Sequence, residues 1–187
     1  ILTMLFTLET ERLILGILDE EYAAMALDFL RRNKDFLEPW SAKRAENQLT
    51  IEKQAVRLHL QSLAFKNQTG VRFYLFKKTN LSRIIGNIAL SNIVRGAFQS
   101  CHLGYQIDEY EQNKGLTTEA LKGIIGYAFE VLQLHRIEAN IMPRNAASIR
   151  VVEKLGFEKE GFSKRYLKIN DKWEDHFSFV LLNEALE

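Results

Sequence analysis

Residues 111–121 read Glu-Gln-Asn-Lys-Gly-Leu-Thr-Thr-Glu-Ala-Leu, and the character of the chain changes across them. The segment Cys101–Ile107 before them is typical of a strand, whereas the apolar residues after them recur with helical spacing. A strand, a short glycine-containing loop and a helix start form an anion site, because the free N–H groups of the first turn and the helix dipole favour negative charge. Gly115 lets the backbone approach a phosphate and Lys114 adds a cation, so we interpret the loop as a pyrophosphate cradle.

This loop alone is a weak signal, because one glycine before a helix is more often an ordinary turn. It has neither the Gly-Lys-Ser/Thr ending of the nucleotide triphosphatase loop nor the three spaced glycines of the dinucleotide fingerprint. The segment downstream strengthens the interpretation. A strand is expected over Arg136–Met142, Pro143 ends it, and a short helix should follow with Asn145 as N-cap and Gly156 at its C-terminus.

This order of elements resembles the GNAT superfamily of acetyl-CoA-dependent N-acetyltransferases. Within it, the chain is most similar to the ribosomal-protein N-terminal acetyltransferases of the RimJ/RimL type. The motifs that carry the resemblance occur in order along nearly the whole chain: Phe36-Leu37-Glu38-Pro39-Trp40, Leu103-Gly104-Tyr105-Gln106-Ile107, Gln112-x-x-Gly115-x-Thr117, Thr118-Glu119-Ala120-Leu121, Leu134-His135-Arg136-Ile137-Glu138-Ala139, Asn145-x-x-Ser148 and Glu153-Lys154-Leu155-Gly156-Phe157.

The chain as a whole, residues 1–187, is expected to form a single α+β domain with no linker. Its pattern predicts a mixed, mostly antiparallel sheet with helices on both faces. The expected strands lie at 12–18, 71–78, 83–91, 101–107, 136–142, 157–169 and 173–182, and the longer helices at 19–33, 47–66 and after the loop. The resemblance implies that the sheet splays apart between the central strands 101–107 and 136–142.

The resemblance also implies where acetyl-CoA, the co-substrate, would bind. Its pantetheine arm would lie in the splay and pair with the first of the two strands, at Tyr105, Gln106 and Ile107. Its pyrophosphate would rest on the backbone of Gln112, Asn113, Lys114, Gly115, Leu116 and Thr117. Asn145 would contact the pantetheine amides as well as capping its helix. The chain departs from the usual family pattern at Asn113 and Thr117, where glycine and glycine or alanine are common. Arg144, Arg150 and Lys154 either hold the adenosine phosphates or form a solvated basic face.

The catalytic groups are only partly specified. Many relatives carry a tyrosine that protonates the departing thiolate, but this chain has Val152 there, and the resemblance implies that Ser148 takes that role. Leu167 stands where RimL-like sequences carry the general base. The base is therefore open between His102, on the strand beside the thioester, and Glu138, on the facing strand, acting directly or through water. His102 also has an ordinary reading as a structural strand histidine.

The acceptor is expected to be a primary amine, acetylated by direct transfer in a ternary complex. Glu38 and Trp40 are the expected wall of an acceptor pocket, and they favour the α-amine of a protein N-terminus, such as that of a ribosomal protein. A small amine such as a polyamine, an amino acid or a drug is the alternative acceptor, and a non-catalytic acyl-CoA-binding module is the third reading.

The composition agrees with these expectations. A formal net charge of +1 gives no basic footprint for nucleic acid or for an anionic membrane. The single Cys101 excludes an internal disulfide and favours a reducing compartment, so we expect a cytoplasmic protein, monomeric or homodimeric. Its scattered histidines and lack of a thiol pair predict no metal site. Cys101 is expected to be a small buried residue rather than an acetyl carrier.

Overall fold

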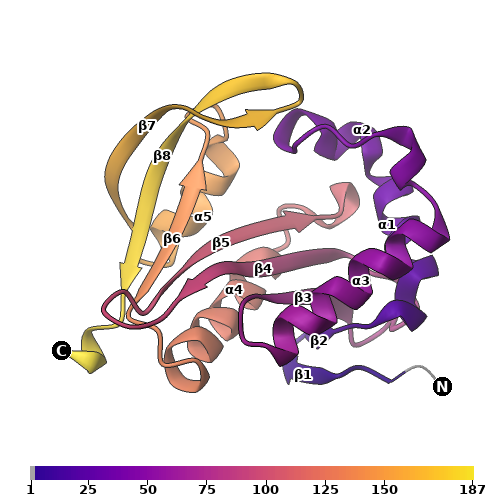
Figure 1. Ribbon diagram of the computed structural model, residues 1–187, viewed down its shortest axis with the longest axis horizontal. Coiled ribbons are helices and arrows are strands. Elements are labelled where there is room, and N and C mark those ends of the chain that lie inside the picture. The colour runs from indigo at the N-terminus through magenta and orange to yellow at the C-terminus, as the bar shows by residue number, and fades with distance from the viewer. Residues whose placement is uncertain (1–2) are drawn as a thin grey trace.

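The computed structural model describes residues 3–187, which build one eight-stranded sheet. The strand order is β1-β2-β3-β4-β5-β6-β8-β7, and β5–β6 is the parallel pair while the other neighbours are antiparallel (Figure 1). The strands are β1 (Phe6–Glu9), β2 (Leu13–Ile17), β3 (Val71–Lys77), β4 (Gly86–Val94), β5 (Ser100–Ile107), β6 (Arg136–Ile141), β7 (Glu158–Ile169) and β8 (Lys172–Leu182). The mixed, mostly antiparallel sheet expected from the sequence is confirmed.

The longer helices follow these strands in the expected order along the chain. The α-helices are α1 (Ala23–Arg32), α2 (Lys34–Leu37), α3 (Ile51–Lys66), α4 (Leu116–Gly126) and α5 (Ala146–Lys154). Short 3-10 turns are η1 (Glu20–Tyr22), η2 (Glu38–Trp40), η3 (Glu46–Gln48), η4 (Glu109–Glu111) and η6 (Glu184–Leu186), and α4 continues into one π-helical turn, η5 (Tyr127–Val131). None of the helices in residues 3–187 is both long and apolar enough to cross a membrane.

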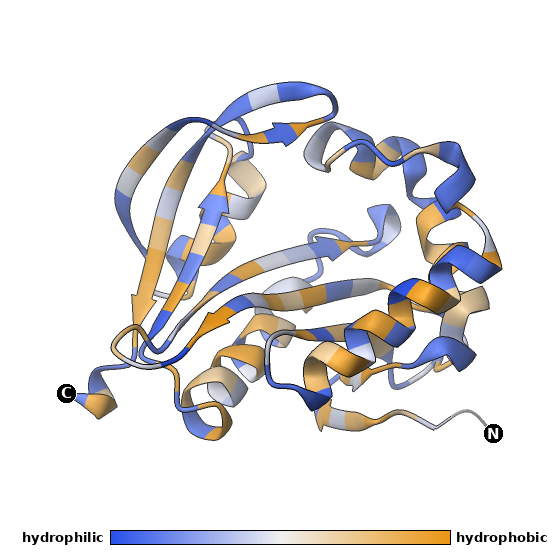
Figure 2. Ribbon diagram, in the orientation of Figure 1, coloured by the Kyte–Doolittle hydropathy of each residue, from blue (hydrophilic) through white to orange (hydrophobic). Residues whose placement is uncertain are grey.

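The two faces of the sheet carry different helices because its strands alternate their side chains (Figure 1). One core cluster joins α4 and α5 to the face that presents Leu15, Phe73 and Leu103. The second joins α1 and α3 to the opposite face, at Tyr74 and Phe76. Helices therefore cover both faces, as predicted, and Figure 2 shows hydrophobic residues alternating along the central strands.

Local signals in the sequence set most of the element ends. Asp19 accepts a hydrogen bond from the N–H of Glu21 and begins the first helical segment as a 3-10 turn. Thr50 caps α3, so that helix starts at Ile51 rather than near residue 47 as expected. Asn170 and Asp171 both have positive φ and form the two-residue turn between β7 and β8, which is the expected hairpin.

Candidate active site

The two central strands separate after a short parallel ladder. Their pairing runs from Ser100 opposite Arg136 to Leu103 opposite Ala139 and goes no further, although β5 continues to Ile107. The N–H of Asp108 donates to the C=O of Ile85 on the β4 side at 2.8 Å. Backbone groups alternate along a strand, so the N–H and C=O groups of Tyr105 and Ile107 point the other way, into the gap. This open edge can pair with an added extended chain, and it lies where the splay was expected.

The loop between β5 and α4 presents a row of free donors at the wide end of this gap. The backbone N–H groups of residues 112–118 donate to no other residue in the described part of the chain. Asn113 and Gly115 both have positive φ, 59° and 75°, which turns successive N–H groups toward one side. Asparagine tolerates this conformation, so Asn113 replaces the family's glycine at little cost. The loop and helix start thus have the geometry of an anion site.

Long-range contacts from the turn between β1 and β2 hold this loop in place. The guanidinium of Arg12 pairs with Glu119 at 2.7 Å and donates from Nη1 to the C=O of Lys114 at 3.0 Å. The carboxylate of Glu119 also accepts from Thr10 at 2.6 Å. A Cβ placed on Gly115 would lie 3.5 Å from Arg12, so the requirement for glycine here comes mainly from the positive φ.

Lys114 is not the free cation that the sequence suggested. The Lys114 ammonium pairs with Glu111 at 3.0 Å, and Lys77 binds the same carboxylate, so the cation expected at the phosphate is partly neutralised. Asp108 is buried, caps the η4 turn that precedes the loop, and pairs with Arg32 of α1. Burial alone would raise the pKa of Asp108, but hydrogen bonds from Tyr110 and Arg32 lower this pKa below its ordinary value.

Helix α5 faces the gap from the other side. Asn145 caps it, accepting from the N–H of Ser148 at 3.3 Å, as predicted. Ser148 is half-buried, and its hydroxyl makes no hydrogen bond within residues 3–187, which leaves that proton available to a bound molecule. The backbone C=O of Ser148 accepts from the hydroxyl of Tyr105 at 3.2 Å, a contact that the sequence did not reveal. Val152 is fully buried in the core and cannot reach the gap.

The two candidate bases lie side by side at the closed end of the gap. His102 and Glu138 are opposite one another in the β5–β6 ladder, on the face away from α4. Asn92 lies with its amide nitrogen 3.3 Å from His102 Nδ1, which is the one side-chain hydrogen bond of that ring within residues 3–187. Glu138 binds Ser178 at 3.1 Å and Arg136 at 3.2 Å. His102 is therefore the less constrained of the two groups.

Leu167 and Cys101 take no part in proton transfer. Leu167 lies on the exposed part of β7, opposite Glu174 of β8. Cys101 is fully buried, and burial raises the pKa of its thiol to about 12. A buried, protonated thiol is a poor nucleophile, so the expectation of a small core residue is confirmed.

Trp40 and its neighbours close the wide end of the gap on the α1/α3 face. Arg144 lies over the Trp40 ring at 4.7 Å, donates to the C=O of Pro39 at 2.6 Å and pairs with Glu174 at 3.4 Å. The guanidinium of Arg144 is thus engaged by Trp40, Pro39 and Glu174, and its role at the adenosine phosphates stays a prediction. Glu38 lies in the same 3-10 turn as Trp40.

The β7–β8 turn completes this enclosure. The N–H of Asn170 donates to the C=O of Ser41 at 2.9 Å, and Lys43 pairs with Asp171 at 2.7 Å. Gln106 of β5 donates to the hydroxyl of Ser41 at 3.1 Å. The segment that follows Trp40 thus contacts both sides of the gap, β5 on one side and the hairpin on the other. Figure 1 shows the hairpin tip beside α2.

Comparison with known proteins identifies this arrangement. Residues 12–158 match the family described as acetyltransferase (GNAT) domain. The probable N-acetyltransferase YjcK of Bacillus subtilis is 42% identical over 81% of this chain and 83% of its own length. The [ribosomal protein uS5]-alanine N-acetyltransferase of Escherichia coli is 38% identical over 90% of this chain and 87% of its own. The crystal structure of a ribosomal-protein-S5-alanine acetyltransferase from Vibrio fischeri superposes with a TM-score of 0.92 at 34% identity, covering 97% of this chain and 99% of that one. The open strand edge, the anion loop and these relatives agree, and the chain belongs to the GNAT family of N-acetyltransferases.

Proposed function

We propose that this N-acetyltransferase uses acetyl-CoA to acetylate the N-terminal α-amine of a protein, with a ribosomal protein as the candidate acceptor. The observation that carries the proposal is the open edge of β5, which points the backbone of Tyr105 and Ile107 into the gap beside a loop of free N–H groups. The names of the relatives from Escherichia coli and Vibrio fischeri support the acceptor class.

The residues present fit the co-substrate. An extended pantetheine arm carries amides that can pair with the Tyr105 and Ile107 backbone, and a pyrophosphate matches the donors of residues 112–117. The Asn145 side chain would serve both as helix cap and as an amide partner. Because residues 112–118 lack internal backbone partners, a bound anion would satisfy donors that otherwise rely on water.

The chemistry requires a neutral amine, a stabilised oxyanion and a proton for the thiolate. An α-amine has a pKa of about 7.7–8.0, so a useful fraction is already neutral near pH 7 and only a modest base is required. His102 is the better placed base, since Glu138 is held by Arg136 and Ser178. The N–H of Tyr105 faces the gap and would donate to the developing oxyanion, and the Ser148 hydroxyl would protonate the departing thiolate.

The test is mass spectrometry on peptides that begin with Ala, Ser, Thr or Met, incubated with acetyl-CoA and the protein. We expect acetylation on the α-amine of one class of N-terminus. Matched peptides with a blocked α-amine and one internal lysine are the control and should remain unmodified. Acetylation of a small amine panel without any peptide product would overturn the protein acceptor. Acetyl-CoA binding without any product would overturn the enzymatic role.

A further inference from the structure

A groove of about 590 Å³ lies beside α3, on the same face of the sheet as Trp40. Its lining mixes apolar side chains, which include Val56 and Leu60, with the cationic side chains of Arg44, Lys53 and Arg57. Val56 and Leu60 are 58% and 60% exposed, so the outer surface of α3 is more apolar than a solvent-facing helix requires. Figure 2 shows this hydrophobic character along α3.

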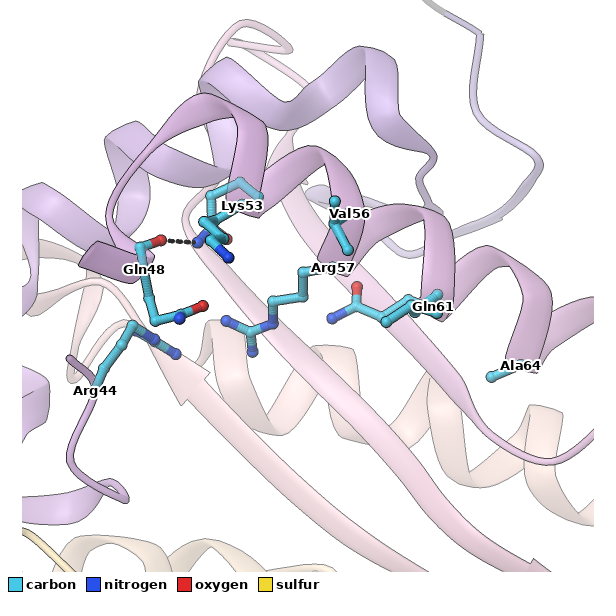
Figure 3. A pocket seen from close by; sticks show the side chains of 9 residues that line it. Arg44, Gln48, Lys53, Val56, Arg57, Gln61 and Ala64 are labelled. Carbon is cyan, nitrogen blue, oxygen red and sulfur yellow. Dashed lines mark hydrogen bonds between the residues drawn. The ribbon is translucent and has the colours of Figure 1, made fainter. Parts of the chain in front are cut away.

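The cations of this groove have no carboxylate partners. Figure 3 shows the guanidinium groups of Arg44 and Arg57 pointing toward each other from opposite walls. Neither Arg44, Arg57 nor the nearby Arg72 forms an ion pair with any residue of 3–187. Partial burial and the charges of Arg57 and Arg72 lower the pKa of Arg44. Burial, and to a lesser degree the charge of Arg57, also lowers the pKa of Arg72.

Uncompensated positive charges held this close repel one another and oppose folding unless an anion joins them. Several cations elsewhere in residues 3–187 sit beside an acid, as Lys43 does with Asp171 and Lys114 with Glu111. The groove is thus set apart by three features at once: converging guanidinium groups, no acid, and an apolar wall. That combination suits an anionic ligand with an apolar body.

A continuous polar track connects this cluster to the gap. Arg72 donates from Nη1 to the side-chain oxygen of Asn87 at 2.5 Å, and Asn87 donates to Gln106 at 3.3 Å. Gln106 lies on the part of β5 that borders the gap and donates to Ser41 at 3.1 Å. The track runs across β3, β4 and β5 on the face where the acceptor would enter. A chain that reaches the gap along this face passes over Arg72.

We propose that the Arg44–Arg57–Arg72 groove binds an acidic side chain of the acceptor peptide, a few residues beyond the amine that is acetylated. Neighbouring strands lie about 4.8 Å apart, so Arg72 on β3 is roughly 10 Å from β5, and an extended peptide covers about 3.3 Å per residue. The acid is therefore expected roughly three to five residues from the N-terminus. Val56 and Leu60 would contact an apolar side chain of the same segment. This inference rests on the proposed function and names a feature of its substrate.

An acidic peptide fits these observations better than nucleic acid does. Nucleic-acid sites need cations spread along a phosphate backbone, and this chain carries a net charge of only +1. The groove instead gathers its cations at one point with an apolar wall beside them. Its charge and shape match one carboxylate on a short segment of extended chain.

The test compares two peptides that the wild-type protein acetylates, identical except for Glu or Gln at positions three to five. We expect the Glu peptide to have a KM lower by roughly tenfold at similar kcat, the ratio typical of one charge-assisted hydrogen bond. Arg57→Gln should raise the KM of the Glu peptide by a similar factor and leave that of the Gln peptide within about twofold. Arg57→Glu should favour a matched Lys peptide over the Glu peptide.

Control variants and control measurements distinguish an error in the groove assignment from misfolding of the variant and from an error in the proposed function. Arg83→Gln removes an exposed arginine just before β4 and should leave both peptides unchanged. Circular dichroism and the acetyl-CoA Kd of Arg57→Gln should match wild type. Equal KM values for the Glu and Gln peptides would overturn the groove assignment while the proposed function stands. If Arg57→Gln lost activity on ribosomal particles but not on free peptides, the groove would be binding RNA, and its assignment to an acidic side chain would also be overturned. Failure to acetylate any peptide would instead remove the proposed function on which the inference rests.

Discussion

The phenolic hydroxyl of Tyr105 donates to the backbone C=O of Ser148 at 3.2 Å, joining β5 to α5 where β5 and β6 have already separated. Helix α5 contacts β6, so this single hydrogen bond spans the two halves of the splayed sheet. It also fixes the helix turn that carries the free Ser148 hydroxyl. Tyr105 is therefore one of the side chains that hold the two sides of the gap together, and it fixes the position of Ser148.

Replacing Tyr105 with Phe keeps the ring and removes this hydrogen bond. The C=O of Ser148 loses its partner, so we expect the free energy of unfolding to fall by about 1–2 kcal/mol and kcat to fall several-fold as α5 shifts. Urea denaturation measures the first change and steady-state kinetics the second.

Burial raises the pKa of Tyr105 to about 12, so its proton stabilises the fold below about pH 10 and that contribution is lost as pH rises toward 12. The alkaline loss of stability should be smaller in Tyr105→Phe, and an unchanged alkaline limb would contradict this assignment.

Ser148→Ala tests the proton donor. We expect kcat to fall by about 10²-fold, the lower range for a general acid, while the acetyl-CoA Kd changes less than about threefold. Calorimetry with acetyl-CoA and a thiol-release assay give the two numbers. Ala146→Ser, on the exposed part of the same first turn, is the matched control and should behave as wild type. Equal losses of affinity and turnover would mean that Ser148 only packs against the gap.

Gly115→Val tests the loop. A branched residue at φ 75° costs roughly 1–3 kcal/mol, so the loop should abandon its geometry. The expected result is acetyl-CoA affinity lowered at least tenfold, measured by calorimetry. Gly126→Ala is the control, because that glycine is helical and a Cβ added to it meets no neighbour within 4 Å. It should bind acetyl-CoA normally, and unchanged affinity in Gly115→Val would place the phosphates elsewhere.

Asp108→Asn tests the buried support of the same loop. The change leaves Arg32 without its buried partner, so we expect a loss of about 3 kcal/mol. Asp28→Asn removes the exposed partner of the same arginine and should cost less than about 1 kcal/mol.

The pKa of Asp108 is lowered in the fold, so the stability that this carboxylate contributes is present above its ordinary pKa of about 3.9 and disappears as pH falls through the lower folded value. Acid denaturation should begin less steeply in Asp108→Asn, and an identical acid limb would exclude this carboxylate as its source.

Local patterns predicted the elements of the site because each element is determined by residues that are close together in the sequence. The strand before Gln112, the glycine at the start of α4 and the Asn145 cap are all set by neighbours within a few residues. The resemblance then supplied the splay, which the end of the ladder at Leu103 and Ala139 confirms. The roles of Ser148, His102 and Glu138 remain proposals.

The contacts that support the site could not be predicted in the same way. Arg12 and Glu119 are 107 residues apart in the chain, and Arg32 and Asp108 are 76 apart. An arginine in a turn and a glutamate in a helix give no local sign that they will meet. The groove was missed for the same reason, because Arg44, Arg57 and Arg72 come from a loop, a helix and a strand that only the fold brings together.

The contact between the hairpin tip and residues 38–43 has a topological consequence. Asn170 on Ser41, Asp171 on Lys43 and Arg144 on Pro39 form a bridge from one side of the gap to the other. A free chain end can pass beneath such a bridge as a single thread, whereas a lysine within a folded loop would have to bring two strands of backbone through the same opening. Under the proposed function, this bridge would favour a chain terminus over an internal lysine by its shape alone, whatever the side chains of the acceptor.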